Sequence, residues 1–282
     1  MPARAWALCL GLIAFLLAAV LGLDAWQTRE GESSLFGLPW GHDERAHVPL
    51  PSTPAPPPIE PRIARVAVIV DGFGARQDLF DRVVAIGQPL TIAILPDLPL
   101  SERIARAAAR AGLEVLLEVP LEPYRYPDVD PGPGVLLLSM SHDEVAGLMT
   151  RYLAELPSVA GVIGHMGSRF TEDRAHMRAL LEPVRARGLV FVDGLVSNLS
   201  VGDAVARALG VRSARRQVRV DYAEGEGPAR RRLEEVASVA ARRGDAVVIV
   251  RGHPLTIRVM KEYIPGWEAR GIRIVPVSRV AQ

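Results

Sequence analysis

From residue 63 to residue 282, short runs of branched apolar residues alternate with longer stretches rich in Ala, Arg and Glu. The run Val66-Ala67-Val68-Ile69-Val70 has no polar position, which is typical of a strand buried on both faces. Parallel strands need a long crossover, usually a helix, to return the chain to the same edge. Seven or eight such strand and helix units fit a (β/α) barrel better than an open sheet.

The predicted elements follow one another with few interruptions. Strands are predicted at residues 66–70, 91–95, 114–119, 160–164, 189–192, 218–220, 246–250 and 272–277. Helices are predicted at residues 77–86, 102–111, 143–155, 173–187, 203–208, 228–243 and 256–270. Ser141 and Glu144 have the spacing of a capping box, and Thr171 is expected to cap the following helix.

The first 62 residues have a different composition. Residues 6–23 form an uncharged apolar run preceded by Arg4, close to the roughly 20 residues that cross a bilayer as a helix. Residues 1–26 are therefore predicted to be a transmembrane anchor, with a cleaved signal peptide as the alternative. Residues 27–62 are predicted to be a Pro-rich linker, which holds an extracytoplasmic, periplasmic domain of residues 63–282 away from the membrane.

Charge and cysteine content argue against a nucleic-acid-binding protein and against a domain held together by disulfides or by cysteine-bound zinc. Lys and Arg total 33 against 32 Asp and Glu, so the chain has no overall positive field to attract nucleic acid. The single cysteine, Cys9, lies in the apolar run, so the domain has neither a disulfide nor a thiolate cluster. Any metal ion must be held by His, Asp and Glu side chains.

Polar side chains follow the predicted strands, where the loops of a parallel barrel open on one face. These residues are Asp71, Asp97, Glu118 with Glu122, His165 with Ser168 and Arg169, Asp193 with Ser197, Asp221, and Arg251 with His253. A single carboxylate at a strand end is often a helix cap, and a single histidine is more often hydrogen-bonded than catalytic. However, His165 stands between Gly164 and Gly167, which allow another group to approach closely.

His253 has a similar setting, between Gly252 and Pro254. Two histidines and Asp71 that converge from different strands are suitable ligands for a borderline divalent metal such as zinc.

Several of these residues lie in motifs of a known family. The motifs are Val68-Ile69-Val70-Asp71-Gly72-Phe73-Gly74, Thr91-Ile92-Ala93-Ile94-Leu95-Pro96, Glu114-Val115-Leu116-Leu117-Glu118-Val119-Pro120-Leu121-Glu122-Pro123, Gly164-His165-Met166-Gly167-Ser168-Arg169-Phe170-Thr171, Phe191-Val192-Asp193 and Gly252-His253-Pro254. In this order they resemble the divergent polysaccharide deacetylases, relatives of the NodB-like carbohydrate esterases that remove N-acetyl groups from chitin-like and peptidoglycan-like sugars.

The resemblance implies an irregular (β/α)7 barrel, an N-terminal anchor and an envelope glycan as substrate. It also implies a divalent metal, with zinc the first choice, that activates water for hydrolysis of an N-acyl group. By matching motifs, Asp71 is the candidate base and His253 the candidate acid. The implied metal ligands are His165, Glu118 and Asp71, and the implied substrate-binding residues are Glu122, Ser168, Arg169, Asp193 and Arg251.

The chain departs from the family pattern at positions that would hold the metal. The first motif usually has two adjacent aspartates, and here the second is Gly72; the third usually begins with His, and here that position is Glu118. Arg251 adds a positive charge that repels a divalent ion and attracts carboxylate or phosphate. Two hypotheses follow: a metal-dependent deacetylase with a rearranged site, or a catalytically degenerate domain that binds glycan or a protein partner. The sequence does not set the oligomeric state.

Overall fold

The computed structural model describes residues 63–156, 158–221, 223 and 225–282. The predicted anchor and the Pro-rich linker lie outside the described residues. Within the described part of the chain, no helix is long and apolar enough to cross a bilayer.

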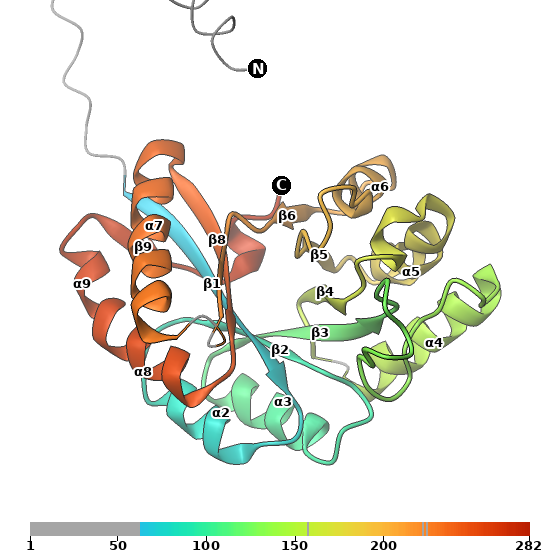
Figure 1. The fold of residues 1–282 in the computed structure, drawn as a ribbon, viewed down its shortest axis with the longest axis horizontal. Helices are drawn as coiled ribbons and strands as arrows, with labels where there is room; N and C mark the ends of the chain where they lie inside the picture. The colour runs from blue at the N-terminus through green and yellow to red at the C-terminus, as the bar shows by residue number, and fades with distance from the viewer. Residues whose placement is uncertain (1–62, 157, 222, 224) are drawn as a thin grey trace, which may run out of the picture. The chain divides into compact units, whose positions relative to one another are not determined.

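One sheet of nine strands forms the centre of the domain, and all of its ladders are parallel. The strands are β1 (Ala64–Phe73), β2 (Thr91–Ile94), β3 (Glu114–Leu121), β4 (Gly161–Met166), β5 (Val190–Asp193), β6 (Ser213–Arg215), β7 (Val218–Val220), β8 (Asp245–Arg251) and β9 (Ile272–Ile274). Their order is β6-β5-β4-β3-β2-β1-β8-β7, and β9 pairs with the first residues of β1. The sheet curls into a half-barrel (Figure 1), which confirms the predicted α/β class.

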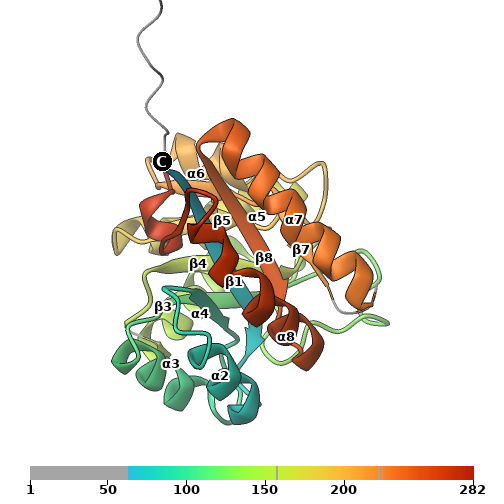
Figure 2. The same cartoon turned by 90° about the vertical axis from the view of Figure 1, so that its left-hand side faces the viewer.

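Helices follow most of the strands and cover the outer face of the curl (Figures 1 and 2). They are α2 (Gln77–Val84), α3 (Ser101–Arg110), α4 (His142–Glu155), α5 (Arg174–Ala186), α6 (Gly202–Ala208), α7 (Glu226–Arg243), α8 (Pro254–Tyr263) and α9 (Pro265–Glu268), with 3-10 turns η1 (Phe170–Glu172) and η2 (Val277–Arg279). The predicted capping box is confirmed at the start of α4, where Ser141 and Glu144 exchange both hydrogen bonds.

The two edges of the curl meet along a single segment, residues 213–220. β6 pairs with β5, and only two residues later β7 pairs with β8, so the segment changes partners. Gln217 makes the change possible: its backbone N–H donates to Val247 O at 2.9 Å, and its side-chain oxygen accepts from Val247 N at 2.5 Å. We call this segment the seam.

Apolar residues pack on both faces of the sheet because its strands alternate between them. Val66, Val68 and Val70 of β1 belong to the large core between sheet and helices. Ala67 and Ile69 belong to a smaller cluster inside the curl. Strands β1 to β6 and β8 all contribute residues to this inner cluster. Polar side chains can face the inside of the curl only beyond the ends of the cluster.

The C-terminal segment closes the inner cluster at the end of the barrel where the strands begin. Val277 N donates to Thr91 Oγ1 at 3.1 Å, and Ser278 N donates to Glu114 Oε1 at 3.2 Å. Gln282 and Ser213 exchange two backbone hydrogen bonds. The inner cluster therefore meets its row of polar residues at the opposite end, where the strands finish.

Three local predictions differ from the structure. The helix predicted at residues 256–270 is two helices, because Pro265 begins α9 and cannot continue the hydrogen bonds of α8. Thr171 lies in the turn η1, and the cap of α5 is Asp173, whose side chain accepts from His176 N. The strand β6 was not predicted, because Ser213-Ala214-Arg215 contains no run of branched apolar residues.

Candidate functional site

Strand alternation places four polar residues at the open end of the inner cluster. Ala67 and Ile69 are followed two residues later by Asp71, Leu116 by Glu118, Ile163 by His165, and Ile249 by Arg251. Each polar residue therefore lies on the inner face, one step beyond the last inner apolar residue of its strand.

These four residues line a cleft of about 550 Å³. Arg219 of β7 enters from the seam, and Val196 and Leu195 come from the loop after β5. The cleft thus combines polar side chains from β1, β3, β4, β7 and β8 with an apolar wall. Ligand pockets commonly have this size, with a few polar groups that fix the orientation of the ligand.

Glu118 and His165 form a buried pair at the base of the cleft. His165 Nδ1 lies 2.5 Å from Glu118 Oε1, and Gly72 N donates to Glu118 Oε2 at 2.7 Å. Both side chains are at least nine-tenths buried. Since both oxygens of Glu118 and Nδ1 of His165 are engaged, Nε2 is the imidazole nitrogen that this arrangement leaves for a ligand.

Asp71 lies between two guanidinium groups. Its Oδ2 is 3.3 Å from Arg219 Nη1, and its Oδ1 is 3.5 Å from Arg251 Nη1. The pKa of Asp71 is raised to about 6, mainly by burial and next by the nearby Glu118, although the two arginines and His165 act to lower it. Burial alone would lower the pKa of Arg251, but Asp71 and Glu118 raise it overall, so the guanidinium stays charged.

Arg251 occupies the space beside Gly72. Gly72 has φ +88°, and a Cβ atom built on it would lie 3.3 Å from Arg251 Nη1 and 3.4 Å from Arg251 Cζ. A side chain at position 72, where the family usually has its second aspartate, would therefore point at the guanidinium. The two departures from the family pattern, Gly72 and Arg251, therefore lie next to each other.

The cleft does not fit a divalent metal. Gly72 offers no ligand, both Glu118 oxygens already accept hydrogen bonds, and Asp71 faces two cations. Among the residues that the structure describes, no three His, Cys, Asp or Glu side chains are arranged to hold a metal ion. A fixed positive charge on Arg251 therefore lies in the cleft for which the resemblance implies a metal ion.

Three of the implied substrate-binding residues form a clamp outside the cleft. Glu122 is buried, and its two oxygens accept from Arg169 Nη1 and from Leu138 N, both at 2.7 Å. Ser168 Oγ accepts from Tyr124 N at 3.2 Å. These contacts hold the long loop after β3 against the loop after β4, so Glu122, Ser168 and Arg169 shape the rim.

Asp193 and His253 also lie outside the cleft lining. Val192 faces the inner cluster, so the next residue, Asp193, faces the other side of β5. Its buried carboxylate accepts hydrogen bonds from Ser200 Oγ and Asp203 N. His253 is the N-cap of α8, where its Nδ1 accepts from Leu255 N at 3.2 Å. It lines a separate apolar pocket. His253 is therefore not among the residues that line the cleft with Asp71 and His165.

Sequence reasoning missed Arg219 and Arg216, which both line the cleft. The signal was present in Val218-Arg219-Val220. The two valines belong to the outer core, so Arg219 between them must face the inside of the curl. Arg216 lies at the change of partners in the seam, and the sequence pattern does not reveal that change.

Fold and cleft together define a parallel α/β half-barrel with a polar site at the ends of its strands. The chain belongs to the divergent polysaccharide deacetylase family, whose model matches residues 68–281.

Three uncharacterized proteins illustrate the similarity. YibQ of Escherichia coli K12 is 26% identical over 200 residues, which are 71% of this chain and 62% of that protein, so the match spans less than two thirds of YibQ. A protein of Haemophilus influenzae is 25% identical over 198 residues, 70% of each chain. A crystal structure of a protein from Agrobacterium tumefaciens C58 has a TM-score of 0.74 and 27% identity, and the match covers 78% of this chain and 90% of that one.

Proposed function

We propose that this protein is a glycan-binding member of its family that has given up metal-dependent deacetylation. The observation that carries the proposal is the Arg251 guanidinium beside Gly72, in the space toward which the second aspartate of the family motif would project. The polysaccharide ligand is carried over from the family to which residues 68–281 belong.

Electrostatics disfavours a metal ion in this cleft. A divalent ion 4 Å from a guanidinium is repelled by about 8 kcal/mol at an effective dielectric constant of 20. Two protein carboxylates, Asp71 and Glu118, already balance Arg219 and Arg251 within the cleft. Entry of the ion would require Arg251 to move, and that movement would leave Asp71 with one cationic partner instead of two.

Without a metal ion, the cleft groups suit binding better than hydrolysis. General acid–base catalysis contributes about 10² to 10⁴-fold, whereas ordinary enzymes accelerate reactions by 10⁶-fold or more. The guanidinium groups and the imidazole can instead donate hydrogen bonds to hydroxyl, amide or carboxylate oxygens of a sugar chain.

The rim of the cleft extends this binding surface. Tyr124 is 59% exposed, and its hydroxyl donates to Glu172. Glu172 also accepts from Ser197, one residue beyond Val196 of the cleft wall. The aromatic ring is therefore held in place by a fixed hydrogen bond, and an immobilised exposed ring is a suitable platform for an apolar sugar face.

The location of the protein is part of the proposal. The predicted anchor in residues 1–26 and the linker in residues 27–62 would tether the domain on the outer side of the inner membrane, beside the envelope glycan.

The test has two arms, both with the full chain. Bound zinc, nickel and cobalt are measured, together with acetate release from an N-acetylated glycan supplied with each metal; we expect neither stoichiometric metal nor turnover. Binding to purified peptidoglycan is then compared for the natural chain, Arg219→Gln and the exposed control Arg178→Gln. We expect Arg219→Gln alone to weaken binding. Metal-dependent acetate release by the natural chain, or equal binding by all three chains, would contradict the proposal.

A further inference from the structure

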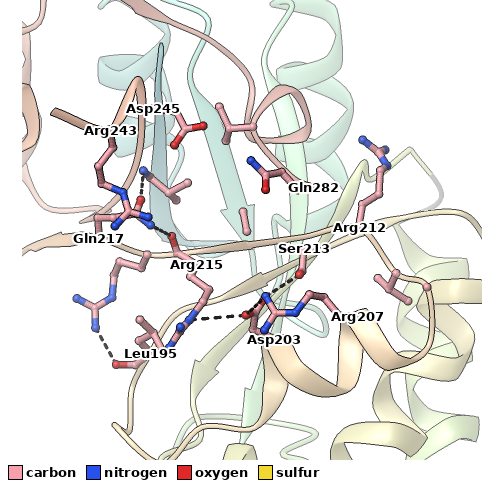
Figure 3. Close-up of a pocket in the computed structure, with 16 residues that line it drawn as sticks. Leu195, Asp203, Arg207, Arg212, Ser213, Arg215, Gln217, Arg243, Asp245 and Gln282 are labelled. Atoms are coloured by element: carbon pink, nitrogen blue, oxygen red, sulfur yellow. Dashed lines mark hydrogen bonds and ion pairs between the residues drawn. The ribbon is translucent and has the colours of Figure 1, made fainter. Parts of the chain in front are cut away.

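A second and larger cavity, of about 730 Å³, opens along the seam (Figure 3). It exists because residues 213–220 change partners: Asp193 pairs with Arg215, whereas Val218 pairs with Val248. Below the change, β6 and the first residues of β8 diverge and leave a wedge between them. We call this wedge the seam pocket.

The lining of the seam pocket is strongly basic. Among the side chains that line it, five arginines face two aspartates, an excess of three positive side-chain charges in a chain whose formal net charge is only +1. The arginines are Arg207, Arg212, Arg215, Arg216 and Arg243, and the aspartates are Asp203 and Asp245. Like charges gathered in one cavity repel one another unless an anion lies between them.

The two aspartates do not neutralise the cavity. Asp203 is buried and holds Arg207 Nη1 at 2.6 Å, while Arg215 Nε approaches the same oxygen at 3.8 Å. Figure 3 shows Arg207 and Arg215 on either side of Asp203. Asp245 pairs with Arg65, at 3.5 Å, which is not among the lining residues. Asp203 therefore positions two guanidinium groups of the pocket, whereas the charge of Asp245 is partly balanced by Arg65, which lies outside the pocket lining.

The other three arginines make no ion pair among the residues that the structure describes. Arg216 donates to the carbonyl oxygens of Gly194 and Leu195, and its pKa is lowered by burial and by the nearby Arg219. Arg212 donates to Ser278 O at 3.2 Å, and Arg243 makes no ion pair with any of the described residues.

We propose that the seam pocket binds a phosphate-bearing ligand. The planar guanidinium fork matches phosphate oxygens, and a doubly charged phosphate offsets the three excess charges better than one carboxylate does. The cavity is much larger than a phosphate ion, so the phosphate belongs to a larger molecule. The seam pocket shares only Leu195 and Arg216 with the cleft that contains Asp71 and His165. The proposal therefore does not depend on the function of that cleft.

Calorimetric titration of the full chain with inorganic pyrophosphate at constant ionic strength tests this site. We expect saturable binding that Arg207→Gln/Arg243→Gln weakens at least about tenfold, because each substitution removes a charge-assisted hydrogen bond to the phosphate. The matched control is Arg106→Gln/Arg178→Gln, which removes two exposed arginines from α3 and α5.

Two results would overturn the proposal: no saturable binding, or equal weakening in both double variants, which would indicate general charge attraction. If the first double variant fails to fold, Arg243→Gln alone provides the same test, because this side chain holds no ion pair among the described residues. We expect that single variant also to bind more weakly than the control.

Vesicles distinguish two sources of the phosphate. The predicted anchor contributes equally to retention on both kinds of vesicle, so only the difference between them is informative. Retention that is stronger on phosphatidylglycerol than on phosphatidylcholine vesicles, with this difference abolished by pyrophosphate and by Arg243→Gln, would support the site and assign the phosphate to a lipid headgroup. Equal retention on both vesicles, with pyrophosphate binding intact, would support the site and assign it to a soluble phosphate ester.

Discussion

Asp71 is a buried carboxyl group whose proton is held more tightly in the folded chain than in the unfolded chain. Its pKa rises from 3.8 to about 6, mainly because burial disfavours the charged form. The folded state therefore binds more protons than the unfolded state between these values. The stability contributed by this proton is fully present below about pH 4 and is lost as the pH rises through about 6.

This difference gives a prediction for Asp71→Asn, which cannot ionise. Each unit of pKa difference corresponds to about 1.36 kcal/mol, so the natural chain should lose up to about 3 kcal/mol relative to Asp71→Asn between pH 4 and pH 7. Urea unfolding of both chains across this range measures the difference. Parallel pH profiles for the two chains would show that Asp71 does not titrate in this way.

Gly72 and Arg251 give a second prediction at the scale of single residues. We expect Gly72→Asp/Glu118→His to bind little zinc, because the new side chain meets Arg251, whereas adding Arg251→Ile should allow close to one zinc per chain. Both variants should lose about 1 to 3 kcal/mol of stability, since φ at position 72 is +88°. Zinc content after dialysis measures the result, with Arg251→Ile alone as the control. Equal zinc in the double and triple variants would mean that Arg251 does not block the site.

At the scale of the strand, much of the site could be predicted from the sequence. The inner residues follow from alternation: Ile69 places Asp71 inside, and Ile163 places His165 inside. The same rule, applied to Phe191 in the outer core, places Asp193 outside the cleft. Hydrogen bonding that depends on loop geometry was not predictable in this way, as the role of His253 in capping α8 demonstrates.

Strand β4 offers a test of how closely the sheet is packed. A Cβ atom on Gly161 would lie 2.4 Å from Val190 Cγ2 and 2.5 Å from Val190 O, and the backbone atom cannot easily move. We expect Gly161→Ala to destabilise the domain by about 3 kcal/mol through overpacking. Thermal unfolding measures the change.

Gly147 provides the matched control for this substitution. It is exposed in α4, and a Cβ atom there has no neighbour within 4 Å among the described residues. Gly147→Ala should therefore stabilise the domain by up to about 1 kcal/mol through helix propensity. Equal effects of the two substitutions would argue against a tight contact between β4 and β5.

For the whole molecule, the alternation of strands and helices was sufficient to predict the α/β class, but it did not predict how the two edges of the sheet are joined. The curl closes through a segment in which Gln217 substitutes a side-chain oxygen for a backbone partner. Such an exchange leaves no periodic signal in the sequence. The seam pocket results from that exchange, so it could not be predicted from the sequence either.

The division of the chain at residue 62 leads to the last prediction. β1 begins at Ala64, and every ladder of the described sheet is formed by residues from Ala64 onward. We expect a chain starting at Ile63 to keep its melting temperature and to leave the membrane fraction after cell disruption. Leu12→Lys/Leu16→Lys in the full chain is the matched variant, since each central lysine opposes insertion by about 2.5 to 3.5 kcal/mol. It should also leave the membrane fraction while retaining the linker. Persistent membrane association of the shortened chain, or a fall in its melting temperature of more than about 5 °C, equivalent to roughly 1 to 3 kcal/mol, would contradict the predicted division.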